Sequence, residues 1–202
     1  MCIRDSRNSD QAVTQEIDLS GTYGHLDWVA GGFFLSETNY NSLIYAFSLG
    51  LSGLPPGSYL NFQQPSYDTK SYAGFADATF HLTKSLKLLA GARYSQDDQT
   101  AVYGNTFGLL IGGQEVQLAA FCPQETDSLK FDSFTPRAGA QYDIDSDKNV
   151  YFTYSKGFKA GGANIYSCAD DFKPEKITAY EGGFKSRLFS NAVTLNLSLI
   201  HI

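Results

Sequence analysis

The chain has 202 residues, of which 14% are aromatic and 18% charged, and its formal net charge is -6. Its 13 Tyr, 15 Phe and 19 Gly suit a β-rich chain with many turns. The acidic balance argues against a nucleic-acid partner, because phosphate binding requires clustered Lys and Arg. No apolar run reaches the roughly 18 residues of a membrane helix, whereas a membrane barrel needs only alternating strands of about ten residues.

Alternation of apolar and polar residues predicts eight strands in chain order. They cover residues 13–23, 26–37, 72–82, 86–94, 134–142, 149 onward, 176–188 and 192–196. Short turns are predicted within each consecutive pair, for example at Gly24 and His25. Three long loops are predicted between the pairs, over residues 39–68, 96–128 and 161–174.

This order of short turns and long loops gives the predicted sheet a direction. All short connections would lie at one end of the strands and all long connections at the other. Outer-membrane barrels have this layout, with short periplasmic turns and longer extracellular loops.

Three stretches carry a resemblance to a known family. Residues 151–162 read Tyr-Phe-Thr-Tyr-Ser-Lys-Gly-Phe-Lys-Ala-Gly-Gly, residues 173–177 read Lys-Pro-Glu-Lys-Ile, and residues 180–186 read Tyr-Glu-Gly-Gly-Phe-Lys-Ser. The phrase Leu-Asp-Trp-Val-Ala-Gly-Gly-Phe-Phe at 26–34 is similar too. In this order and spacing, the motifs strongly resemble the barrel of TonB-dependent outer-membrane receptors. The resemblance covers most of residues 13–196.

The resemblance implies an all-β fold, an antiparallel up-and-down meander of about eight strands that is part of a larger transmembrane β-barrel. Complete plugged barrels of this kind have about 22 strands. The implied location is the cell outer membrane, in contact with its lipid, and no enzymatic activity is implied. By resemblance, the complete protein takes up a ferric siderophore or a similar bulky solute. The TonB complex would power uptake through a plug domain missing from this chain.

Two other architectures fit the alternation of the strands. One is a self-contained eight-stranded outer-membrane barrel with a structural or adhesive role. The other is a soluble, lipocalin-like barrel that binds a ligand. Finding the aromatic side chains inside a small closed barrel would favour the soluble protein.

Strand parity separates a greasy face from a charged face. We expect Phe152, Tyr154, Phe158, Tyr180 and Phe184 to point to lipid. The opposite parity holds Asp77, Thr153 and Ser155 together with the lumen-facing candidates, which are Arg93, Arg137, Lys159, Glu181, Lys185 and Arg187. A water-filled or plug-packed lumen could hydrate or pair these charges, whereas Arg or Lys facing lipid would cost about 2 to 4 kcal/mol. We also expect cationic neighbours to pair with Glu181.

The two ends of the chain are expected to be non-native. Residues 1–6 and 197–202 can be encoded by complementary DNA that resembles a transposon end used in library preparation. Such segments are excluded from fold reasoning. Residues 7–196 are therefore taken as the partial receptor barrel.

The sequence offers few residues for site chemistry. Cys122 and Cys168 form a candidate disulfide, because each lies in a long predicted loop on the same rim. Asp143, Asp145 and Asp147 begin like a calcium loop but lack its Gly and its final Glu, so a polar hairpin turn is expected. We predict no catalytic set, cofactor site or metal site.

Overall fold

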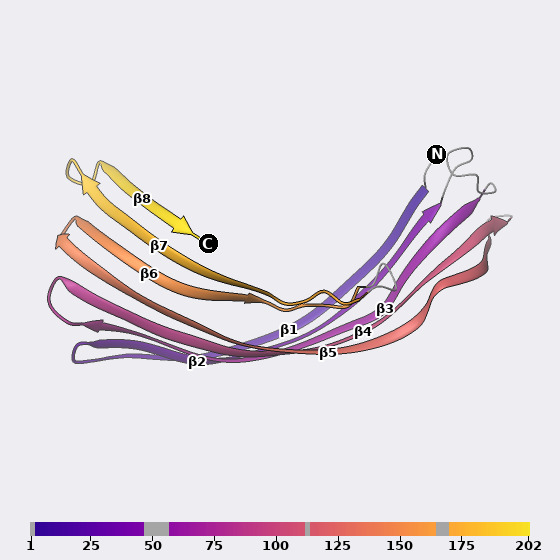
Figure 1. Cartoon of the computed structure of the whole chain (residues 1–202), viewed down its shortest axis with the longest axis horizontal. Helices are drawn as coiled ribbons and strands as arrows, with labels where there is room; N and C mark the ends of the chain where they lie inside the picture. The colour runs from indigo at the N-terminus through magenta and orange to yellow at the C-terminus, as the bar shows by residue number, and fades with distance from the viewer. Residues whose placement is uncertain (1–2, 47–56, 112–113, 165–169) are drawn as a thin grey trace.

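A computed structural model of the chain describes residues 3–46, 57–111, 114–164 and 170–202, which form one eight-stranded antiparallel sheet (Figure 1). Each strand pairs with the next in sequence, so the sheet is a meander. The strands are β1 (Ile3–Tyr23), β2 (Leu26–Ala46), β3 (Ser58–His81), β4 (Leu86–Ile111), β5 (Gln114–Asp145), β6 (Lys148–Lys159), β7 (Glu175–Leu188) and β8 (Val193–His201). The predicted fold class is confirmed. The described ranges contain no helix long and apolar enough to cross a membrane.

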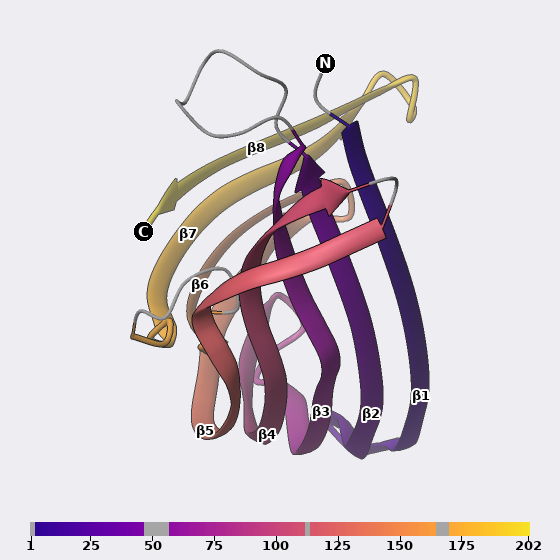
Figure 2. The ribbon, with the colours of Figure 1, turned by 90° about the vertical axis from the view of Figure 1, so that its right-hand side faces the viewer.

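The sheet is curved and open. Figure 2 shows it bending round from β1 to β8, and each of these two edge strands has a single neighbour within the described part of the chain. A self-contained barrel, whether in a membrane or soluble, would require β1 to pair with β8. The observed sheet therefore corresponds to a section of the wall of a larger barrel.

Four short connections lie at one end of the sheet, at the left of Figure 1. They are residues 24–25, 82–85, 146–147 and 189–192. Gly24 has a φ of 58°, a left-handed conformation that glycine adopts without steric cost. We call this end the turn end and the opposite one the loop end. The prediction that the four short turns share one end of the sheet is confirmed.

Two of the three predicted long loops are wrong, because most of their residues continue the strands. Residues 39–46 and 58–68 extend β2 and β3, and residues 96–111 and 114–128 extend β4 and β5. The third loop, between β6 and β7, is observed. Pro65 was read as a loop residue, yet it lies in β3 at a register shift between Gln63 and Ser66. A bulge is where a strand tolerates proline, which lacks the N–H needed for regular pairing.

Cross-strand register sorts the side chains into two faces. The outer face carries the exposed apolar residues, among them Ile17, Leu19, Trp28, Tyr72, Phe80, Leu88, Tyr94, Phe134, Tyr142, Phe152 and Tyr180. The inner face carries Glu16, Asp18, Phe33, Phe75, Asp77, Arg93, Arg137, Thr153, Glu181, Lys185 and Arg187. Inner-face side chains meet across intervening strands, as when Arg137 of β5 reaches Asp77 of β3. We infer that this face is the concave one.

The apolar band of the outer face has the height of a membrane. From Tyr72 in β3 to Leu82, the first residue after that strand, it covers ten steps or about 33 Å at the rise of a strand. At the tilt of about 40° found in membrane barrels, this length gives a band about 25 Å tall. Towards the loop end the same face becomes polar at Lys70 and Asp68. The band therefore has the height of the apolar band of a membrane barrel.

Both ends of the chain are paired in the sheet. Residues 3–6 pair with β2, and residues 197–201 pair with β7. Backbone pairing by itself does not show that a segment is native. The non-native origin of residues 1–6 and 197–202 therefore stays a prediction.

Candidate functional site

A polar recess lies on the inner face at the loop end, outside the apolar band. Its volume is about 330 Å³. Its lining residues are Asn8, Asp10, Asn39, Tyr40, Asn41, Gln64 and Tyr67. Register places Asp10 opposite Asn39 and Asn39 opposite Tyr67, so three adjacent strands supply the lining. The recess offers amide, carboxylate and phenol groups to a polar ligand.

The chain between β6 and β7 packs against the same face. We call residues 160–164 and 170–174 the inner segment. Gln99 donates a hydrogen bond from Nε2 to the carbonyl oxygen of Gly161 at 3.2 Å, and Tyr67 donates from its hydroxyl to Gln99 Oε1 at 2.7 Å. Backbone hydrogen bonds of 3.1 and 2.8 Å join Gly162 and Phe172. Tyr67 therefore lines the recess and also supports the inner segment.

A small buried cluster anchors the inner segment. Ala163 is 6% exposed and packs with Ala101, Tyr103 and Cys122, with Tyr67 and Leu129 around them. Ala101 and Tyr103 belong to the inner face of β4. These apolar contacts hold the segment at a defined position.

Two carboxylates near the inner segment are hydrogen-bonded to neutral hydroxyls. Asp97 accepts a hydrogen bond from Ser71, and Asp127 accepts one from Tyr103. The bond to Asp127 raises the pKa of Tyr103, which therefore remains a protonated donor. Burial raises the pKa of Tyr67 in the same direction. The loop end thus combines neutral phenols with negative carboxylates.

The middle of the inner face holds two of the lumen-facing candidates. Arg137 pairs with Asp77 across Gly91, whose missing side chain leaves room for the carboxylate. The guanidinium carbon of Arg93 lies 5.2 Å from the ring centre of Phe33 and 5.7 Å from that of Phe75. Such stacking is favourable for a cation.

The remaining candidates follow the same parity. Lys159, Glu181, Lys185 and Arg187 are on the inner face by register, and Arg187 pairs with Asp147 at 3.2 Å. Their exposure to a lumen stays a prediction.

The expected ion pair of Glu181 is wrong. Within the described ranges, Glu181 instead accepts a hydrogen bond of 2.6 Å from the hydroxyl of Tyr151. Lys185 lies over the ring of the same tyrosine, with Nζ 5.1 Å from its centre. Tyr151 comes between the two charges because it shares their face on the neighbouring strand.

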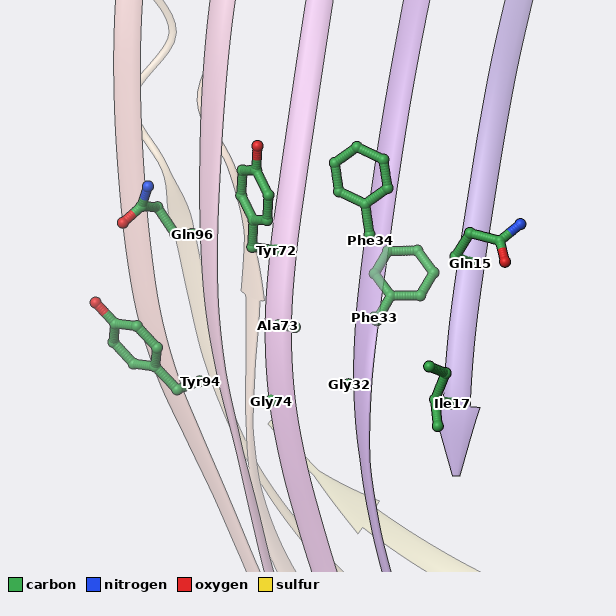
Figure 3. Close-up of a pocket in the computed structure, with 10 residues that line it drawn as sticks. All are labelled: Gln15, Ile17, Gly32, Phe33, Phe34, Tyr72, Ala73, Gly74, Tyr94 and Gln96. Atoms are coloured by element: carbon green, nitrogen blue, oxygen red, sulfur yellow. The ribbon is translucent and has the colours of Figure 1, made fainter. Parts of the chain in front are cut away.

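An apolar groove of about 630 Å³ lies on the outer face (Figure 3). Its floor includes Gly32 and Gly74, and the rings of Phe34 and Tyr72 lie beside it with centres 5.3 Å apart. It sits at the loop-end edge of the apolar band. Hydrocarbon suits this groove better than a polar solute does, so we do not regard it as the solute site.

The expectations about cysteines and metals have different outcomes. Cys122 is disulfide-bonded. Cys168 lies outside the described residues, so its pairing with Cys122 stays a prediction. The acidic hairpin at the β5–β6 turn is held by Lys148, whose Nζ lies 2.9 Å from Asp145. Over the part of the chain that the structure describes, no three His, Cys, Asp or Glu residues gather as a metal site would require.

Sequence reasoning missed the residues of the recess and of its support. Tyr67, Gln99, Tyr103 and Asp127 all fall in segments that were predicted as loops. Parity contained a usable signal, because Tyr67 continues the inner-face series of Ser71 and the other odd-numbered residues of β3.

Known proteins similar to this chain are receptors. A family model described as "TonB dependent receptor-like, beta-barrel" matches residues 3–202. The catecholate siderophore receptor Fiu of Escherichia coli O6:H1 is 25% identical over 221 residues, which cover 95% of this chain and 29% of Fiu. Fiu of Escherichia coli K12 is 23% identical over 219 residues, with the same coverages. The chain therefore spans about 29% of the length of these curated relatives.

Solved structures show the same fold. The ferric yersiniabactin uptake receptor FyuA from Yersinia pestis has a TM-score of 0.75 at 20% identity, covering 98% of this chain and 29% of FyuA. The closed form of Fiu from Escherichia coli K12 has a TM-score of 0.66 at 17% identity, covering 98% of this chain and 31% of Fiu. The curved sheet is thus the fold of a section of a receptor barrel.

Proposed function

We propose, because this chain belongs to the TonB-dependent receptor β-barrel family, that it forms part of the wall of a receptor that takes up a ferric siderophore. The family consists of receptors and transporters rather than enzymes, and it belongs to the cell outer membrane. Outer-membrane lipid would cover the apolar band, and the lumen would lie on the inner face. The relatives named for siderophores support the choice of solute.

The observation that carries the proposal is the position of the polar recess. It lies on the inner face and on the loop side of the apolar band, where a solute arriving from outside the cell would first meet the barrel. Asn39, Asn41 and Gln64 offer both donors and acceptors to a polar chelate, and Tyr67 adds an aromatic ring. We assign the first contact with the solute to this recess.

Uptake through such a wall needs parts that this chain does not supply. We propose that a plug domain elsewhere in the complete protein fills the lumen and couples it to the TonB complex. Arg93, Arg137, Lys159, Glu181, Lys185 and Arg187 would face that lumen. The two exposed edges of the sheet support a larger barrel around that lumen, because β1 and β8 each have a free side for a further strand.

Transport by the complete receptor tests the proposal. The full-length gene would be expressed in a strain that lacks its own siderophore receptors, and uptake of radiolabelled iron would be measured with a panel of ferric siderophores. We expect TonB-dependent uptake of at least one, and weaker uptake after Tyr67→Ala. Tyr72→Ala, on the outer face of the same strand, is the matched control. No uptake of any siderophore by well-expressed receptor would refute the proposal.

A further inference from the structure

The inner face becomes more negative towards the loop end of the sheet. Between the row of Arg93 and the row of Asn41, the inner face of β1–β5 carries six acidic residues, namely Asp10, Glu16, Glu37, Asp97, Glu125 and Asp127. In the described part of this area, register places no Lys or Arg among them. Arg93 and Arg137 lie nearer the middle of the sheet. The loop end of the wall is therefore negative.

The lysines at this height lie on the other face. Lys70 and Lys130 both register with Asp98 on the outer face, and Lys130 lies 3.6 Å from that carboxylate. A strand places successive side chains on opposite faces, so these cations are separated from the recess by the thickness of the sheet. They do not neutralise the inner-face acids.

The hydrogen bonds accepted by the inner-face carboxylates do not neutralise their negative charge. Asp97 is held by the hydroxyl of Ser71, and Asp127 by the hydroxyl of Tyr103. A hydroxyl orients a carboxylate without bringing a positive charge. Asp170 and Asp171 of the inner segment add two further acids nearby, against the single cation Lys173.

A negatively charged loop end discriminates between solutes by their charge before any close contact forms. Like charges raise the energy of an approaching anion, and opposite charges concentrate a cation at the entrance. The recess at the same place offers neutral amides and a phenol, which bind uncharged polar groups. Its chemistry therefore suits a solute whose surface is polar and not anionic.

We propose that this part of the wall selects ferric chelates that are neutral or positively charged, such as tris-hydroxamates, over anionic tris-catecholates. The inference rests on the proposed function and names the chemical class of its solute. Asp97 and Asp127 would be the specificity-determining residues, since both lie beside the inner segment. They act through charge at a distance and also orient Tyr103 and Ser71.

Binding to the purified full-length receptor tests the inference. Three probes would be compared by tryptophan-fluorescence quenching: a neutral ferric tris-hydroxamate, a cationic one with a free ammonium group, and a ferric tris-catecholate. We expect the two hydroxamates to bind more tightly than the catecholate, and high salt to weaken the cationic probe most. In Asp97→Asn and Asp127→Asn, affinity for the cationic probe should fall about threefold to tenfold for each carboxylate removed.

The control variant is Asp98→Asn, which removes an equal charge from the outer face of the same strand. It should leave the ranking of the three probes and their affinities unchanged, and native-like melting of all variants would show that they fold. Tighter binding of the catecholate, unaffected by either inner-face variant, would overturn the charge selection and leave the receptor function standing. Failure of every probe to bind would overturn both.

Discussion

The orientation of the sheet can be tested with one pair of substitutions on β3. Ala76 lies on the outer face at the middle of the apolar band, and Ala73 lies on the inner face three residues away. An arginine on the lipid face at the bilayer midplane costs about 2 to 4 kcal/mol. On the inner face the guanidinium can reach water or Glu16, so a change of about 0.5 kcal/mol or less is expected. Ala76→Arg should thus be about 1.5 to 3.5 kcal/mol less stable than Ala73→Arg.

The assay is reversible unfolding of the full-length receptor in lipid vesicles, followed through tryptophan fluorescence during a guanidinium titration. Wild type and the two variants would be compared at equal lipid ratio, with the fraction folded checked by heat-modified gel mobility. Because both substitutions replace alanine by arginine in one strand, differences in strand propensity largely cancel. Equal losses of stability, or a larger loss for Ala73→Arg, would refute the assignment of the two faces.

Three further predictions concern the edges, the inner segment and the disulfide. Residues 7–196 expressed without detergent should be insoluble, because open strand edges and an exposed apolar face favour association; a monodisperse, cooperatively melting monomer would contradict this. Gln99→Ala should speed amide exchange in the inner segment about fivefold, since it removes hydrogen bonds worth about 1 kcal/mol. The outer-face variant Gln96→Ala serves as its control, and equal exchange in both would argue against the contact. Thiol labelling of the native full-length protein should modify neither Cys122 nor Cys168, and modification of both would rule out their pairing.

Sequence alone could predict the part of the sheet that carries the apolar band, because successive side chains of a strand point to opposite faces and here the two faces differ in polarity. Phe152 and Tyr154 alternate with Thr153 and Ser155, and their register across β5 to β7 keeps each set on one face. In this part of the chain the alternation along each strand agrees with the pairing of the whole sheet. The positions of the short turns follow from the ends of the alternating stretches. Side-chain polarity therefore predicts which face of each strand is apolar.

In the loop-end extensions polar residues occur on both faces, so the contrast between the two faces is weaker. Residues 96–100 read Gln-Asp-Asp-Gln-Thr, which is polar at every position, yet they pair with both neighbouring strands. Gly, Pro and Asn in these stretches indicated loops, whereas the structure uses several of them at register shifts. Polarity predicts exposure, and only pairing with a neighbour distinguishes an exposed strand from a loop.

Partners across the sheet were harder to predict than faces. Parity placed Glu181 and Lys185 on one face, but the choice of Tyr151 as the partner depends on the register between β6 and β7. The contact between Gln99 and Gly161 joins residues 62 positions apart in the chain. No local pattern contains such information.

The position of the inner segment follows from the unequal lengths of neighbouring strands. β5 has 32 residues and β6 has 12, and their pairing ends at Arg137. The next residue of β5 is Pro136, which has no N–H to donate to a continued ladder. Beyond this point β5 pairs with β4 alone, and the chain leaving β6 is free to turn towards the inner face of the taller strands. There Gln99 and the cluster around Ala163 hold it beside the recess.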